Sequence, residues 1–147
     1  MRNCNSLSTL VWLIAVVFML GLSFIYTKAA EEKAATSEAV TVELKAVDNS
    51  GVSGEATLTP VEDKTKVDIK LTGAPEGVAQ PTHIHEGTCE NLGAPKYPLE
   101  AVKDGKSETT IDAKVSDLTA GDFAINVHKS EKEMSAYAAC GAVSPTD

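Results

Sequence analysis

The stretch Val40-Thr41-Val42-Glu43-Leu44-Lys45-Ala46 shows the period on which the fold depends. Apolar residues occupy every second position, and polar or charged residues lie between them. Because successive side chains of a β-strand point to opposite faces, this alternation predicts a strand with one buried face and one solvated face. The run Asp48-Asn49-Ser50-Gly51 follows and is typical of a turn.

The same alternation recurs along the rest of the chain. It predicts further strands around Ala56 and Leu58, around 67–71, around 111–115, around 123–127 and over 137–143. No segment has a convincing helical pattern, and 117–119 and 131–136 are long enough for a helical turn at most. Seven or eight short strands with turns between them predict an all-β fold, an antiparallel β-sandwich or flattened barrel.

The N-terminal residues have a different composition from the rest. Arg2 precedes an apolar run over residues 10–26, which is typical of an export signal, and Ala29 is a plausible cleavage point. The run is also nearly long enough for a membrane anchor. We therefore expect a signal peptide or anchor over 1–30, a polar linker over 31–38 and one domain over 39–147. The domain is expected outside the cytoplasm, in the periplasm, on the cell surface or secreted, with membrane contact only through an uncleaved leader.

The net charge argues against one class of partner, and the cysteine count predicts a covalent link. The chain has 13 basic and 21 acidic residues, a net charge of −8, which argues against a nucleic-acid partner. Removal of the leader removes Cys4 and leaves Cys89 and Cys140. An even pair in an exported chain predicts a disulfide bond, and the alternative is two buried free thiols.

The three histidines of the chain lie in two short motifs. His83 and His85 are two residues apart on a predicted strand, so both side chains point to one face, while Ile84 points to the core. His128 follows the apolar Val127 on another predicted strand. We expect all three on an outer face of the sheet, where they form a metal site.

Imidazole nitrogen is a ligand for copper, zinc, iron and nickel. Three neutral nitrogens without a thiolate or carboxylate fit trigonal Cu(I). A three-histidine zinc site with an open position is the alternative. A blue-copper site needs a cysteine closely followed by histidine, and nothing of that kind follows Cys140.

The stretch from about residue 39 to residue 143 resembles the Cu/Zn superoxide dismutase family. The resemblance is carried by Ser53-Gly54, by His83-Ile84-His85-Glu86-Gly87 with Cys89, by Asn126-Val127-His128 and by Ala139-Cys140-Gly141. It implies a Greek-key β-sandwich and one copper ion on His83, His85 and His128. It also implies a disulfide between Cys89 and Cys140 that ties a loop to the last strand.

The departures from that family bear on activity. The family uses a further histidine to bridge copper and zinc, and two more histidines with an aspartate to bind zinc; this chain has no histidine left, so no zinc is expected. Tyr137 stands where the family has an arginine that attracts superoxide. Lys129 and Lys132 are candidates to replace its positive charge, or are ordinary solvated lysines.

The chain also resembles bacterial chordin-type (CHRD) domains. These share a His-Ile-His-x-Gly block and a late Asn-Val-His, here Asn126-Val127-His128, and the segment 93–99 is similar too. That domain has a related fold and a poorly defined biochemical role. The cysteine pair favours the dismutase side of the resemblance.

Three functions remain open. The first is a copper-binding protein that stores, buffers or delivers copper, with a copper-donor protein as a partner. The second is a copper-only superoxide dismutase, and the third is a structural module without catalysis. Glu86 and Asn126 are candidates to orient the ligands, and Met134 is a candidate soft ligand; for each of them an ordinary surface or packing role is the alternative.

Overall fold

The computed structural model describes residues 38–144, where the predicted alternation becomes β-strands. In that range lie eight strands and one helix: β1 Val40–Ala46, β2 Ser53–Val61, β3 Lys64–Thr72, β4 Gln80–Thr88, β5 Asn91–Val102, β6 Lys106–Ile111, α1 Val115–Ala120, β7 Phe123–His128 and β8 Tyr137–Val143. The predicted leader over 1–30 and all but the last residue of the predicted linker over 31–38 lie outside the described residues.

No helix among residues 38–144 is both long enough and apolar enough to span a membrane.

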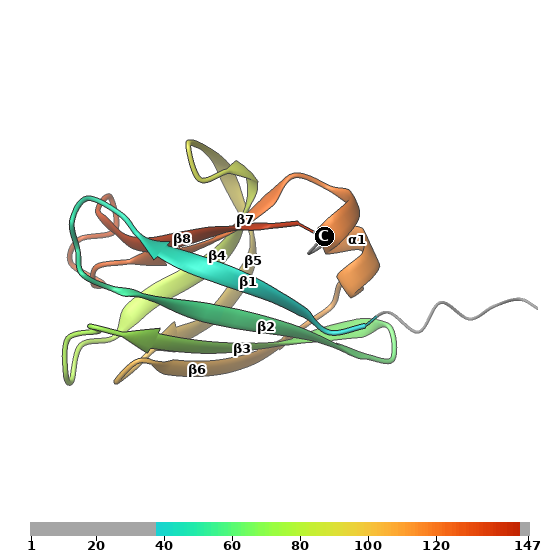
Figure 1. Ribbon diagram of the computed structural model, residues 1–147, viewed down its shortest axis with the longest axis horizontal. Coiled ribbons are helices and arrows are strands. Elements are labelled where there is room, and N and C mark those ends of the chain that lie inside the picture. Colours follow the sequence, from blue (N-terminus) through green and yellow to red (C-terminus); the bar gives the residue numbers. More distant parts are fainter. Residues whose placement is uncertain (1–37, 145–147) are drawn as a thin grey trace, which may run out of the picture. The chain divides into compact units, whose positions relative to one another are not determined.

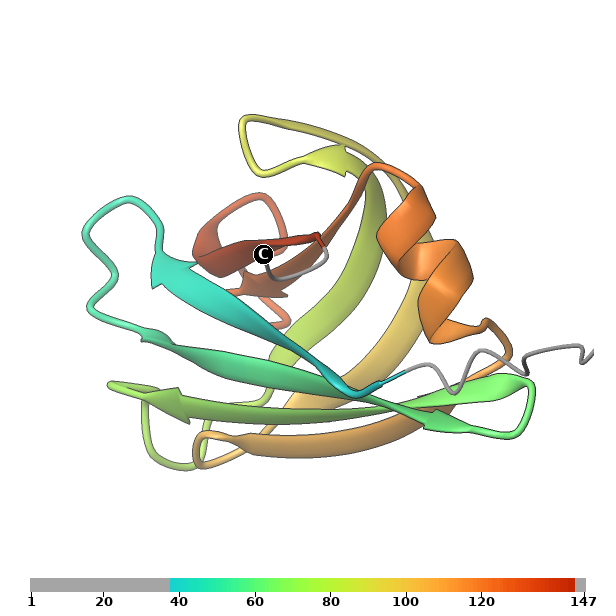
Figure 2. The same cartoon turned by 45° about the vertical axis from the view of Figure 1, so that its right-hand side comes forward.

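The strands form one antiparallel sheet that folds over on itself. Their order is β5-β4-β7-β8-β1-β2-β3-β6, so β4 pairs with β7 and β1 pairs with β8. These two pairings between strands distant in sequence are Greek-key crossovers. One half, β1 to β3 with β6, faces the other half, β4, β5, β7 and β8 (Figures 1 and 2). The structure thus confirms the predicted all-β Greek-key sandwich or flattened barrel.

The core fills the space between the two halves. Leu44, Leu58 and Ile69 come from one half, and Ile84 and Ile125 come from the other; each is at most 1 % exposed. Their positions follow the sequence alternation, since each lies between two residues of the opposite face. Burying five side chains of this size contributes on the order of 2 kcal/mol each before conformational entropy is counted.

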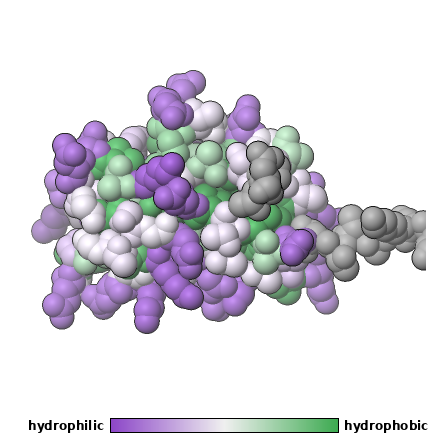
Figure 3. Space-filling model, in the orientation of Figure 1, coloured by the Kyte–Doolittle hydropathy of each residue, from purple (hydrophilic) through white to green (hydrophobic). Residues whose placement is uncertain are grey.

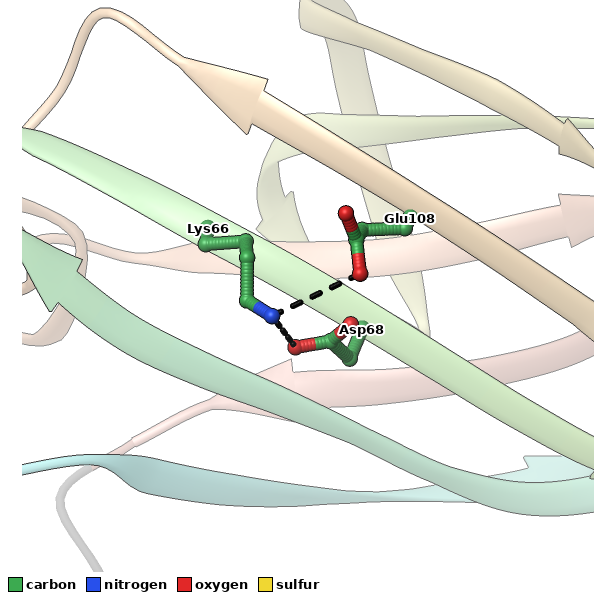
Figure 4. Close-up of polar contacts among 3 residues, drawn as sticks. All are labelled: Lys66, Asp68 and Glu108. Atoms are coloured by element: carbon green, nitrogen blue, oxygen red, sulfur yellow. Dashed lines mark hydrogen bonds and ion pairs between the residues drawn. The ribbon is translucent and has the colours of Figure 1, made fainter.

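Hydrophilic side chains project along the lower edge of Figure 3, where β3 and β6 of the first half lie in Figure 1. Lys66 on β3 contacts Asp68 on the same strand at 3.0 Å and Glu108 on β6 at 3.4 Å (Figure 4). These pairs are solvated, so their net contribution to stability is small. Their effect is to keep this face of the sheet polar.

The predicted strand over 111–115 is wrong after its first residue. β6 ends at Ile111, and Val115 begins α1 at one end of the barrel (Figure 2). Val115 and Leu118 are buried, which is the three-residue spacing of a helix and not the two-residue spacing of a strand. The Lys114 carbonyl accepts hydrogen bonds from the amides of Asp117 and Leu118, which closes the helical turn.

Candidate metal centre

Strand pairing brings the three histidines to one face of the second half-sheet. β4 and β7 are antiparallel neighbours, with His83 opposite Asn126 and His85 opposite Ala124. His128 lies two residues beyond Asn126 on β7, and therefore on the same face. The residues between them, Ile84 among them, point into the core. The sequence alternation predicted this arrangement.

The three imidazoles are close enough to share one ion. One nitrogen from each histidine lies within 4.8 Å of the corresponding nitrogens of the other two. His83 Nδ1 and His128 Nε2 are 3.3 Å apart. The ring centroids are separated by 5.3 to 6.2 Å, with rings inclined to one another rather than stacked. Convergent nitrogens on inclined rings are an arrangement suited to metal binding.

The backbone fixes which nitrogen His85 can offer. Its Nδ1 lies 3.0 Å from the carbonyl oxygen of Gly93, so Nδ1 carries the proton and donates this hydrogen bond. Its Nε2 is buried and has no hydrogen-bond partner among the described residues. A backbone carbonyl behind the distal nitrogen is a common support for a metal-binding histidine. A lone pair left unpaired in the interior fits the role of a metal ligand.

Two of the three histidines are almost fully buried. His85 is 6 % exposed and His128 is 5 % exposed, and only His83 is half-buried. The histidines therefore lie on the outer face of the sheet, as expected, but other chain segments cover them. Gly93 from β5 contacts His85, and the ring of Tyr137 lies 5.3 Å from that of His128.

This burial also controls the charge of the site. Loss of hydration lowers the pKa of His83, and the neighbouring His128 and His85 lower it further. Loss of hydration likewise lowers the pKa of His128. Both effects favour the neutral imidazole, which is the form that binds a metal.

A disulfide bond lies beside the histidines and links the turn after β4 to β8. Cys89 and Cys140 are bonded, with Cα atoms 5.9 Å apart, which confirms the prediction. Cys140 on β8 lies directly opposite Asn126 on β7. The bond thus anchors the turn after β4 to β8, next to the strand that carries His128.

A bulge in β8 places Tyr137 at the site. Val127 pairs with Ala139, whereas the next residue, His128, pairs with Tyr137, so Ala138 is an extra residue on β8. Without this extra residue Tyr137 would point to the opposite face of the strand. Tyr137, which stands where the related family has an arginine, therefore lies beside His128 because of a bulge that the sequence alternation does not predict.

The other candidate residues lie in different surroundings. The carboxylate of Glu86 contacts Lys96 Nζ at 2.8 Å, and its side chain is about half exposed. Lys129 and Lys132 line an open cleft of ≈ 820 Å³ together with Asp48. None of the three histidines lines that cleft. Met134 is 43 % exposed.

Sequence analysis missed Gly93 as a partner of His85. The contact joins residues eight positions apart, across a hairpin whose pairing shifts register three times. A side chain at residue 93 would also press on the Glu86 carbonyl, 2.9 Å from the added Cβ. The only sign of this close contact in the sequence was the glycine at position 93.

Comparison with known proteins assigns the sequence to a family and finds solved structures with a similar fold. The sequence model described as CHRD domain matches residues 33–135. No curated protein matches the chain. Two solved structures of variants of superoxide dismutase 5 from Candida albicans are similar to it. One has a TM-score of 0.54 at 16 % identity and covers 76 % of this chain and 94 % of its own. The other has a TM-score of 0.52 at 14 % identity and covers 75 % and 92 %. The predicted dismutase-like fold is thus confirmed.

Proposed function

The chain belongs to the CHRD domain family, and from that premise we propose that it is an extracytoplasmic copper-binding protein. His83, His85 and His128 bind one copper ion. The observation that carries the proposal is the buried Nε2 of His85, which has no partner among the described residues and lies within 4.8 Å of the nitrogens of the other two histidines. Leaving such a polar atom unpaired costs about 1–3 kcal/mol, which a bound ion would recover.

Copper is favoured over other metals by the donor set. Three neutral imidazoles with no thiolate or carboxylate among them suit copper, and the lowered pKa of His83 keeps its imidazole neutral. Zinc on the same three histidines is the chemical alternative, and loading with both metals in competition distinguishes them. We expect one copper and no structural zinc.

The proposed location rests on two features. Residues 1–30 have the composition of an export leader, and the Cys89–Cys140 disulfide is stable in an oxidising compartment. The domain over 39–147 would then receive copper from a donor protein outside the cytoplasm. A protein that receives copper in this way could store, buffer or deliver it.

The direct test is copper content. The parent chain, loaded anaerobically with Cu(I) and dialysed, is expected to retain one copper per chain. His128→Ala removes a ligand and should weaken binding by more than about 100-fold, since even outer partners of metal ligands are worth 10–100-fold. Lys132→Ala is the matched control and should retain the ion. A parent chain without copper would leave the structural module as the better proposal.

A copper-only superoxide dismutase is the second candidate, and one observation favours it. The fold is similar to that of superoxide dismutase 5 from Candida albicans. A bound copper would supply one-electron redox chemistry. The three histidines would hold the ion, Lys129 and Lys132 are the candidate sources of positive charge, and water would deliver protons. Pulse radiolysis of the copper-loaded chain tests this, and a rate no better than that of a simple copper complex excludes it.

A further inference from the structure

Asn126 is a buried polar residue that the fold leaves without partners. Its side chain is 0 % exposed, and neither Oδ1 nor Nδ2 has a hydrogen-bond partner among the described residues. Buried amides are nearly always hydrogen-bonded, because leaving one unpaired costs about 1–3 kcal/mol for each polar group. An apolar residue of similar size would fit the interior of a sheet better, so the amide needs an explanation.

The position of Asn126 supplies that explanation. On one side it lies directly opposite His83 of β4, and on the other side directly opposite Cys140 of β8. Cβ atoms of opposite residues on one face are about 5 Å apart. His128 follows two residues later, about 7 Å along the same face. His85 is the diagonal neighbour, opposite Ala124. The amide therefore has all three histidines as its neighbours on the face.

The disulfide restricts what can reach this amide. Cys140 is 4 % exposed and is bonded to Cys89, directly beside Asn126. Bulk water therefore does not solvate the amide. Three histidines leave a fourth coordination position open on a bound ion, and the Asn126 oxygen is the unused donor beside them.

We propose that Asn126 Oδ1 is the fourth ligand of the metal, an inference that rests on the copper site proposed above. A neutral oxygen is a harder donor than imidazole, so it stabilises Cu(II) and contributes little to Cu(I). Three histidines alone would hold Cu(I), so the added oxygen would strengthen the binding of Cu(II) selectively. Asn126 would then set the balance between the two oxidation states.

The test separates the two oxidation states. Asn126→Val removes the oxygen and keeps a compact side chain. We expect its affinity for Cu(II), measured against a chelator, to fall at least tenfold while its affinity for Cu(I) changes less than about threefold. A tenfold selective loss raises the reduction potential by about 59 mV for one electron. Asn126→Asp keeps an oxygen donor and should retain the parent affinity for Cu(II). The spectrum of bound Cu(II) in electron paramagnetic resonance should change in Asn126→Val alone.

Stability of the metal-free protein gives an independent readout. If the amide is unsatisfied without the ion, Asn126→Val should unfold at the same temperature as the parent or higher. Asn91→Val, at an exposed position of β5, is the matched control for both measurements and should leave both unchanged.

Equal losses of Cu(I) and Cu(II) affinity, or a lower unfolding temperature for Asn126→Val, would overturn the inference and make Asn126 a packing residue. A parent chain that binds no copper would overturn the inference together with the proposed function. A parent that binds Cu(II) as tightly as Asn126→Val would overturn the inference alone.

Discussion

At the scale of single residues, each histidine is prepared for a metal in a different way. The Gly93 carbonyl holds His85 by its Nδ1 and leaves Nε2 free. His128 packs against Tyr137, and His83 is the one of the three that is only half-buried. The donor nitrogen of His85 is therefore set before any ion arrives. Such preorganisation lowers the entropic cost of binding.

The pH dependence of the copper-free protein follows from two of these residues. Burial lowers the pKa of His83 and His128 below the usual value of about 6.5, so the unfolded chain binds more protons than the folded one. Their contribution to stability is therefore fully present above about pH 6.5. It is lost as the pH falls from there through the lowered pKa values. Urea unfolding between about pH 5 and pH 8 measures this slope.

A variant identifies the groups responsible for that slope. His128→Gln removes one of the two titrating groups and should flatten the dependence of unfolding free energy on pH, with the stability at pH 8 altered less than that at pH 5.5. Copper affinity should fall over the same interval, because protons compete for the nitrogens. A parent protein equally stable at pH 5.5 and pH 8 would show that the two imidazoles are hydrated like those of the unfolded chain.

At the scale of secondary structure, the sequence alternation predicted the strands but not the irregularities that complete the site. A period of two placed His83, His85 and His128 on one face, because the pairing between β4 and β7 is regular over residues 82–86 and 123–127. It could not place Tyr137, since the bulge at Ala138 depends on how β8 pairs with β7. The alternation also predicted a strand through residues 111–115, whereas Val115 is the first residue of α1 and is buried there. Pairing across the sheet decides the bulge, and backbone hydrogen bonds to the Lys114 carbonyl form the helix.

The disulfide is the element-level constraint on the site. Replacing both cysteines, as Cys89→Ala with Cys140→Ala, frees a loop of 51 residue positions. The chain-entropy relation gives a loss of about 4 kcal/mol in the free energy of unfolding. Copper affinity should also fall, because Cys140 lies beside Asn126 and the bond fixes the turn after β4. Denaturant unfolding and copper titration measure the two effects. Unchanged copper affinity would mean that the turn does not position the site.

At the scale of the whole molecule, a short seam joins the two halves of the barrel. β1 pairs with β2 over five residues but with β8 only through Lys45 and Ala46, opposite Cys140 and Ala139. On its other edge, β8 pairs with the strand that carries His128. A change in the seam is therefore expected to affect both halves of the barrel.

Gly141 is the residue of β8 on which this seam depends most. A Cβ at this position would overlap the Glu43 carbonyl oxygen of β1 and lie 2.9 Å from side-chain carbons of Val42 and Leu44. Gly141→Ala should therefore push β1 from β8 and lower the free energy of unfolding by about 2 kcal/mol or more, in the range of overpacked cores. Ala142→Ser, one residue on and exposed, is the control and should stay within about 0.5 kcal/mol of the parent. Urea unfolding of the two variants measures both values. If Gly141→Ala were as stable as the parent, β1 could move away from β8 at little cost, and the second half-sheet would hold the histidines without support from the seam.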